Sequence, residues 1–179
     1  MIEMAVLGLL KERSMHGYEL KKELTGQLGQ FWQISYGSLY PTIRRLEKAA
    51  AVERIFPVTD VKRRKNIYRI TDLGNEMFKQ LLSENSTMDD ARFSMKLAFF
   101  RYLKSEDRVD LLERRRAYLT EKLAELRSKL RTYRERIDAY TLQLMEHGVD
   151  TTAADIAWVE KLLAEEKSHS EPKPSRATT

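Results

Sequence analysis

The chain has 179 residues, of which 42% are hydrophobic and 33% charged, so it can bury an apolar core and is not disordered as a whole. It has no apolar stretch near the roughly 20 residues that a membrane-spanning helix needs. It also has no cysteine, which excludes disulfides, thiolate zinc sites and Cys nucleophiles. Glycines number only seven and prolines only four, which predicts a mainly helical protein.

The positive charge is concentrated in the N-terminal half. Residues 1–85 contain 14 Lys and Arg against 10 Asp and Glu, an excess of four within the formal net charge of +5. The sequence pI near 9.3 favours an anionic partner such as nucleic acid. Residues 62–65 add a local concentration, four cations in succession without an acidic neighbour.

Three helices are predicted in the first part of the chain. Apolar residues at helical spacing indicate helices over residues 2–13 and 18–28. Ser35 is a suitable N-cap for a third helix that ends near Lys48. The apolar stripe of that helix, expected in the core, is Leu39, Ile43 and Leu46. At 100° per residue, the opposite face and its flanks carry polar and basic residues: Gly37, Ser38, Tyr40, Pro41, Arg44, Arg45 and Lys48.

A β-hairpin and a fourth helix follow. Residues 52–58 are rich in β-branched and aromatic side chains, and residues 67–71 alternate apolar with polar ones. The two segments are therefore predicted to be strands around a turn at 59–66. Thr71 then caps a helix that begins at Asp72. Three helices closed by a hairpin are typical of a winged helix-turn-helix domain. There, the third helix enters the DNA major groove and the hairpin, or wing, contacts the backbone or minor groove.

The C-terminal half predicts a second, helical domain. Apolar residues there alternate spacings of four and three, the pattern of a coiled coil. We expect one continuous helix from about 106 to 146, ended by His147 and Gly148, and a last helix opening with a capping box at Thr152. So long a helix needs a partner, most simply a second copy of the chain. The predicted dimerisation residues are Leu112, Leu119, Leu123, Leu126, Leu130, Tyr133, Ile137, Tyr140 and Leu144.

These patterns divide the chain into three segments. Residues 1–83 form the predicted winged helix-turn-helix DNA-binding domain, and residues 88–167 the helical, coiled-coil-like dimerisation domain. Residues 168–179 are polar and include two prolines, so we expect a disordered tail.

Three motifs in the first half of the chain together match the pattern of one known family. They are HGYEL at 16–20, SYGSLYPTIRRLE at 35–47 and RRKNIYRITDLG at 63–74. Together, in this order, they resemble the PadR family of transcriptional regulators, in its longer form with a helical C-terminal dimerisation domain. The resemblance implies a cytoplasmic, dimeric repressor of a nearby promoter, often released by a small-molecule signal.

The sequence departs from the family pattern at two positions. Ser14 stands where a proline usually precedes the first motif, and Ala50 stands where the turn after the third helix usually has glycine. The alanine would let the third helix continue by a turn and change the angle of the wing.

The candidate DNA-binding residues lie on the third helix, at the start of the second and in the wing. Hydroxyl and guanidinium groups bind phosphates and base edges, and a basic wing neutralises phosphates. A solvated helix face, a structural cap at His16 and a turn made soluble by charge are the alternatives. The candidates are His16, Tyr18, Ser35, Tyr36, Ser38, Tyr40, Pro41, Thr42, Arg44, Arg45, Lys62, Arg63, Arg64 and Lys65.

Other sites have weaker signals. Trp32 and Trp158 are candidates for a pocket that holds a flat aromatic effector, with ordinary packing as the alternative. The three histidines lie far apart without acidic residues at ligand spacing, so we expect no metal. No catalytic triad, phosphate loop or cofactor motif is visible, so we expect neither catalysis nor a cofactor.

The sequence therefore predicts a DNA-binding transcriptional regulator. A dimer would place two recognition helices about 34 Å apart, one turn of DNA, on a palindromic operator. The alternative is a coiled-coil adaptor whose winged domain binds a protein. We expect no membrane partner.

Overall fold

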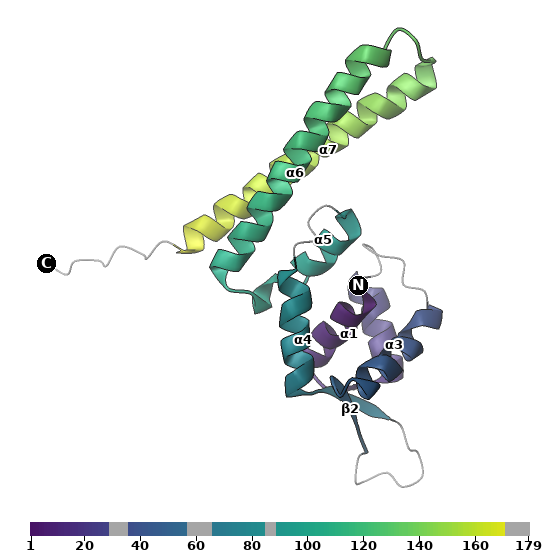
Figure 1. The fold of residues 1–179 in the computed structure, drawn as a ribbon, viewed down its shortest axis with the longest axis vertical. Helices are drawn as coiled ribbons and strands as arrows, with labels where there is room; N and C mark the ends of the chain where they lie inside the picture. The colour runs from purple at the N-terminus through teal and green to yellow at the C-terminus, as the bar shows by residue number, and fades with distance from the viewer. Residues whose placement is uncertain (29–35, 57–65, 85–88, 171–179) are drawn as a thin grey trace, which may run out of the picture. The chain divides into compact units, whose positions relative to one another are not determined.

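The computed structural model of the chain describes residues 1–28, 36–56, 66–84 and 89–170. These residues form two compact units, residues 1–103 and the residues from Lys104 onward (Figure 1). Over the described ranges, no helix combines the length and the hydropathy needed to cross a membrane.

The first unit is the predicted winged helix-turn-helix. Its strands form an antiparallel sheet in the order β1-β3-β2, in which the register pairs Tyr68 with Met15 on one side and with Arg54 on the other. The two strands of the wing are confirmed, whereas the short β1 was not predicted. The elements are α1 (Ile2–Glu12), β1 (Met15–His16), α2 (Gly17–Glu23), the π-helical turn η1 (Leu24–Leu28), α3 (Tyr36–Lys48), β2 (Val52–Ile55), β3 (Ile67–Ile70), α4 (Asp72–Ser83), α5 (Asp90–Leu97) and the 3₁₀ turn η2 (Phe100–Tyr102).

The core of this unit is built around α1. Every residue of α1 from Met4 to Leu10 is buried, because α3, α4 and β3 all contact this helix. Phe78 of α4 packs edge to face against the ring of Phe99, with 5.6 Å between centroids. A Cβ atom on Gly8 would lie 2.5 Å from that second ring, so only glycine permits α1 to approach so closely. The core therefore includes residues that follow α5.

The segment from α5 to η2 belongs by its contacts to the first unit. Met95 and Phe99 are members of its buried cluster, and Leu103 packs against that cluster. The functional limits of 1–83 and 88–167 remain a prediction.

The third helix ends where its own turn stops it. Ala50 has φ 56°, the left-handed conformation in which helices commonly end. The N–H of Ala51 donates to the carbonyl of Leu46, and the N–H of Ala50 donates to that of Glu47, both at 2.9 Å. This pattern is a Schellman motif. The expected extension of the helix past Lys48 is therefore wrong, because Ala50 adopts the conformation usually given to glycine.

Thr71 fixes this turn from the other side. Its hydroxyl donates to the carbonyl of Ala50 at 2.7 Å and accepts the N–H of Gly74 at 3.0 Å, which confirms the predicted N-cap of α4. Its own N–H donates to the carbonyl of Ala51 at 3.1 Å. One side chain thus joins the end of the third helix, the end of β3 and the start of α4.

The second unit is an antiparallel pair of long helices, α6 (Ser105–Tyr133) and α7 (Ala139–Ser170), which pack along their lengths (Figure 1). Arg108 near the start of α6 pairs with Glu166 near the end of α7 at 2.9 Å. The predicted continuous helix over 106–146 is wrong, because the chain turns after Tyr133. Asp138 accepts the N–H groups of Tyr140 and Thr141 at 2.9 and 3.1 Å, which is how an N-cap starts a new helix.

The predicted helix boundary at 147–152 is also wrong. α7 runs through His147 and Gly148, since one glycine in a helix interior costs only about 1 kcal/mol and packing against α6 offsets it. Thr152 is buried, and its hydroxyl donates to the carbonyl of Gly148 at 2.8 Å instead of capping a helix. α7 continues to Ser170, three residues into the segment expected to be disordered.

The apolar seam is divided by this hairpin. Its first members, Leu112, Leu119 and Leu123, are buried within the unit, where α7 supplies Val159 and Leu163 as buried partners. Its later members are more exposed: Leu126, Leu130 and Ile137 are intermediate, and Tyr133, Tyr140 and Leu144 are 48, 89 and 71% exposed. The first half of the seam therefore finds its partner within the chain, and the role of the second half in a dimer stays a prediction.

Candidate nucleic-acid interface

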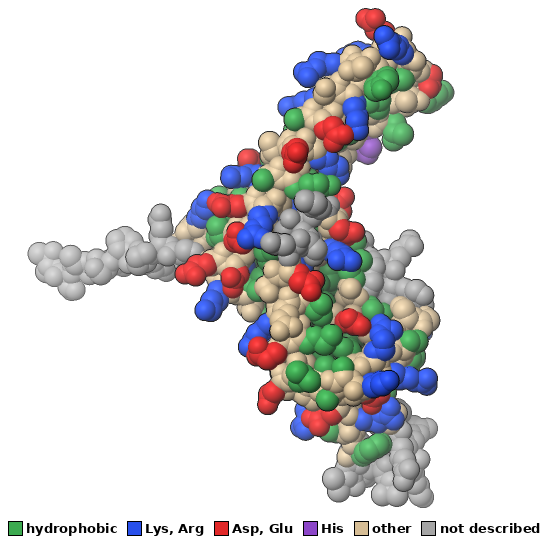
Figure 2. Space-filling model, in the orientation of Figure 1, with side chains coloured by type: hydrophobic (Ala, Val, Ile, Leu, Met, Phe, Trp, Pro, Cys, Tyr) green, Lys and Arg blue, Asp and Glu red, His purple; other side chains and the backbone are tan. Residues whose placement is uncertain are grey.

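The outer face of α3 is polar and open. Leu39, Ile43 and Leu46 are each 1% exposed, as the helical spacing predicted, and they hold α3 against the core. The opposite side presents partly or fully exposed side chains: Ser38, Tyr40, Pro41, Arg44 and Arg45. In Figure 2, basic side chains gather over the part of the first unit where Figure 1 places α3 and β2, whereas acidic and basic side chains alternate along the helical hairpin.

The two arginines of α3 are held differently. The guanidinium of Arg45 donates to the hydroxyl of Thr42 at 3.0 Å and to the carboxylate of Glu3 in α1 at 3.4 Å. Arg44 is exposed and forms no ion pair with any described residue. The two guanidinium groups on this face therefore differ: that of Arg45 is hydrogen-bonded to two described residues, whereas that of Arg44 pairs with none of them.

Thr42 is the exception among the residues predicted to contact DNA. It is fully buried, because residues 39, 42, 43 and 46 together form one inward face. A direct contact with DNA is excluded by this burial. Thr42 acts on the surface only through Arg45, which it orients.

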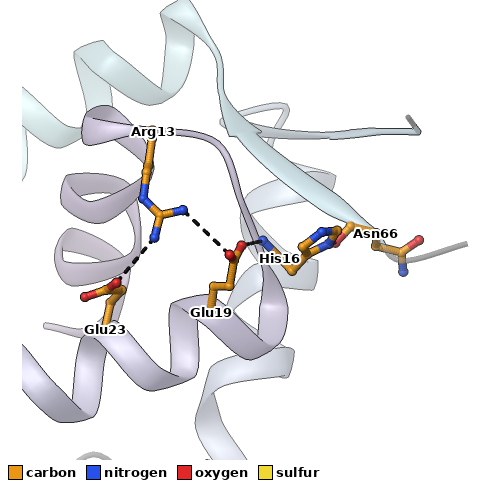
Figure 3. A network of polar contacts seen from close by, with 5 residues as sticks. All are labelled: Arg13, His16, Glu19, Glu23 and Asn66. Carbon is orange, nitrogen blue, oxygen red and sulfur yellow. Dashed lines mark hydrogen bonds and ion pairs between the residues drawn. The ribbon is translucent and has the colours of Figure 1, made fainter. Parts of the chain in front are cut away.

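The start of α2 is fixed by a polar network (Figure 3). The backbone N–H of His16, the N-cap residue, donates to the carboxylate of Glu19 at 2.8 Å. Arg13 pairs with Glu19 at 3.8 Å and with Glu23 at 3.3 Å. The ring Nδ1 of His16 lies 3.2 Å from the carbonyl oxygen of Asn66, which is close enough for a hydrogen bond in the tautomer that has the proton on Nδ1. His16 thus ties α2 to the base of the wing, and its contact with a phosphate stays a prediction.

A cleft of about 640 Å³ opens where α2, α3 and β3 meet. Tyr18 and Tyr40 stand at its edge, 72 and 49% exposed, whereas Tyr68 is almost fully buried. A Cβ atom on Gly17 would lie 3.1 Å from the ring of Tyr40 and 3.4 Å from that of Tyr68, so glycine leaves room for both rings at the start of α2. The lining residues are His16, Gly17, Tyr18, Glu19, Lys22, Tyr40, Asn66 and Tyr68.

Five of the lining residues were not among the predicted DNA-binding residues: Gly17, Glu19, Lys22, Asn66 and Tyr68. Lys22 follows Tyr18 by one helical turn and therefore shares its face. Asn66 directly follows the basic run, so its position beside that run was a usable signal. Both add polar groups beside the candidate DNA-binding tyrosines.

Some predicted site residues lie outside the described part of the chain: Ser35, Trp32 and the basic run Lys62, Arg63, Arg64 and Lys65. Tyr36 is the first residue of α3. Trp158 lies on α7 and is 44% exposed, and its predicted part in an effector pocket with Trp32 stays a prediction. Among the described residues, His, Asp and Glu form no cluster suited to a metal ion.

Two protein-family models match the chain. The model of the "Transcriptional regulator PadR-like family" matches residues 6–80, and that of the "Virulence activator alpha C-term" matches residues 91–166. The chain belongs to the PadR-like family. The first match spans α1 to α4 of this PadR-like regulator, and the second spans α5, α6 and most of α7.

Individual relatives of this PadR-like chain cover nearly its whole length. The "Negative transcriptional regulator PadR" of Bacillus subtilis is 24% identical over 174 residues, which are 91% of this chain and 96% of that protein. The structure of B. subtilis PadR in complex with operator DNA covers 92% of this chain and 98% of that one, at 21% identity and a TM-score of 0.43. The Vibrio cholerae virulence activator AphA covers 95% and 100%, at 22% identity and a TM-score of 0.41.

Proposed function

We propose that this PadR-like regulator is a cytoplasmic repressor that binds a palindromic operator as a homodimer. One observation carries the proposal: α3 buries its apolar stripe and presents Ser38, Tyr40, Arg44 and Arg45 outward, beside the base of a wing. In a winged helix-turn-helix, this face is the one that enters the major groove. By analogy with the negative regulator of B. subtilis, we propose that binding represses a nearby promoter.

The roles of the side chains follow from their chemistry. Arg44 is exposed, forms no ion pair with a described residue and is suited to bridge O6 and N7 of a guanine. Arg45 is held by Thr42 and Glu3, so it enters the groove in a fixed direction. Tyr18 and Lys22, at the edge of the cleft, are suited to phosphate oxygens, which fix the register of the protein on the duplex.

Dimerisation through the second unit would bring two DNA-binding units to the operator. The exposed Tyr140 and Leu144 of α7 are the large apolar side chains that a second copy would cover, since Tyr is enriched where interfaces concentrate their binding energy. Two linked heads bind two half-sites far more tightly than one head binds one.

Release by a small aromatic effector is the last part of the proposal. Such a ligand would change the angle between the two heads and so the spacing of the half-sites. Quenching of tryptophan fluorescence by candidate aromatic compounds tests for this ligand. Unchanged emission across such compounds contradicts an effector site at Trp32 and Trp158.

The test of DNA binding is a gel shift with the DNA upstream of the gene, at about 50 and 200 mM salt. If the protein neutralises six to ten phosphates, raising the salt between these concentrations would weaken binding by about 10³ to 10⁵. Replacing Arg44 and Arg45 together by alanine should weaken operator binding by about 10² or more, because each good base contact contributes about 1 to 3 kcal/mol.

A matched control removes two exposed arginines of α6, Arg127 and Arg131, and should leave binding nearly unchanged. Retained binding by the Arg44 and Arg45 variant would refute this placement of the DNA-binding face. A shift that does not respond to salt would favour a protein-binding adaptor instead.

A further inference from the structure

A paired carboxylate and guanidinium connect the recognition helix to the wing. Glu47 lies in the last turn of α3, and Arg54 is the third residue of β2. Nε of Arg54 donates to Oε1 of Glu47 and Nη2 donates to Oε2, both at 3.0 Å. Two parallel bonds of this kind fix direction as well as distance. The bond to Glu47 also raises the pKa of Arg54, so the guanidinium stays charged.

The pair is also fixed to the second strand of the wing. Arg54 lies opposite Tyr68 in the β2–β3 register, and its guanidinium carbon lies 5.8 Å from the centroid of that ring. Tyr68 is 6% exposed and lines the cleft between α2 and α3. The two charged side chains therefore join α3, β2 and β3 at one point.

Electrostatics alone would not favour a carboxylate here. Glu47 lies on the helix proposed to enter the groove, where a negative charge is repelled by phosphates. Its partner Arg54 is 39% exposed, and Glu47 is 21% exposed, so the pair is partly accessible to solvent. A structural task explains the pair better than a DNA contact does.

We propose that Glu47 and Arg54 are positioning residues that hold the wing at one angle to the recognition helix, and that Glu47 keeps Arg54 from binding phosphate. The inference rests on the proposed DNA-binding function. Along the chain, a short turn of residues 49–51 connects α3 to β2, and Thr71 also bonds to this turn. Holding that angle makes base contacts by α3 and backbone contacts by the wing occur in one register, which is what specificity requires.

The first test needs no DNA. Hydrogen exchange on the free, full-length protein should show faster exchange of the amides of residues 50–55 in Glu47→Gln than in the parent. The matched control is Glu53→Gln, which breaks the 2.8 Å pair of Glu53 with Arg69 within the hairpin and leaves α3 untouched. Equal exchange in the parent and Glu47→Gln would overturn the positioning role.

The second test compares operator with random-sequence DNA. Glu47→Gln should lower the ratio of the two affinities about tenfold. It should also steepen the salt dependence on random DNA by about one unit of log K against log salt, because the freed Arg54 then binds a phosphate. Arg54→Gln should lower the ratio equally without changing that slope, and the double variant should be no worse than either.

Each other outcome is decisive. If Arg54→Gln flattens the slope by about one unit while Glu47→Gln changes nothing, Arg54 is a phosphate ligand and the proposal fails. If Glu47→Gln does not fold, as judged by circular dichroism, Arg54→Lys replaces it. That variant keeps the charge but not the two parallel bonds, and should also lower the ratio. If the parent shows no salt-sensitive binding at all, the proposed function fails, and the exchange experiment still decides the positioning role.

Discussion

Replacing Ala50 with glycine should stabilise the protein. Ala50 sits at φ 56° between the recognition helix and the wing, and an L-residue pays about 1 to 2 kcal/mol in this conformation. Glycine avoids that cost but loses about 0.5 to 1 kcal/mol more backbone entropy on folding. The net gain should be about 0.5 to 1 kcal/mol.

Urea unfolding of the full chain, followed by circular dichroism, measures this difference. The matched control is Ala49→Gly. Its N–H donates to the carbonyl of Arg45 at 2.9 Å and its φ is not positive, so glycine there should cost up to about 1 kcal/mol. A loss of stability in Ala50→Gly equal to that of Ala49→Gly would refute the left-handed turn and mean that the helix continues. Operator affinity should stay unchanged in Ala50→Gly, because glycine keeps the same backbone.

Three further predictions concern stability and assembly. Gly74→Ala should lower the free energy of unfolding by about 3 kcal/mol, because the new Cβ atom would lie 2.0 Å from a main-chain oxygen. Gly148→Ala, whose Cβ atom would have nothing within 4 Å, should raise it by about 0.5 to 1 kcal/mol. Equal unfolding midpoints in the two variants would contradict both predictions. Burial lowers the pKa of Lys96, which is 2% exposed and donates to the carbonyls at the end of α4. Unfolding therefore takes up a proton just below pH 10.5, and stability should rise with pH across that window relative to Lys96→Met; parallel pH profiles would disprove this linkage. Replacing Tyr140 and Leu144 together by serine should weaken the dimer at least about tenfold in sedimentation, without loss of helix content.

Much of the first unit follows from local sequence. The 3.6-residue period of Leu39, Ile43 and Leu46 predicted which face of α3 is buried, since a helix against a core has to follow that period. Thr71 was predicted as a cap because a hydroxyl before an apolar helix satisfies free N–H groups. Thr42 lies on the same inward face, but a threonine is too weakly apolar for that period to reveal its burial.

Longer-range features could not be predicted in the same way. A seam with spacings of four and three is equally suited to a partner helix in the same chain or in a second copy, so periodicity could not reveal the turn between α6 and α7. The cap at Asp138 was the local signal for that turn. At Ala50, helix propensity predicted that the third helix would continue. The helix ends instead, and the carbonyl of Ala50 accepts a hydrogen bond from Thr71, which is remote in sequence.

The most direct test of the account is a footprint of the purified protein on the DNA that flanks its gene. We predict two protected half-sites centred about one helical turn apart, both lost in the Arg44→Ala and Arg45→Ala double variant. A single protected site, or protection that the double variant retains, would contradict a dimer that reads DNA with α3.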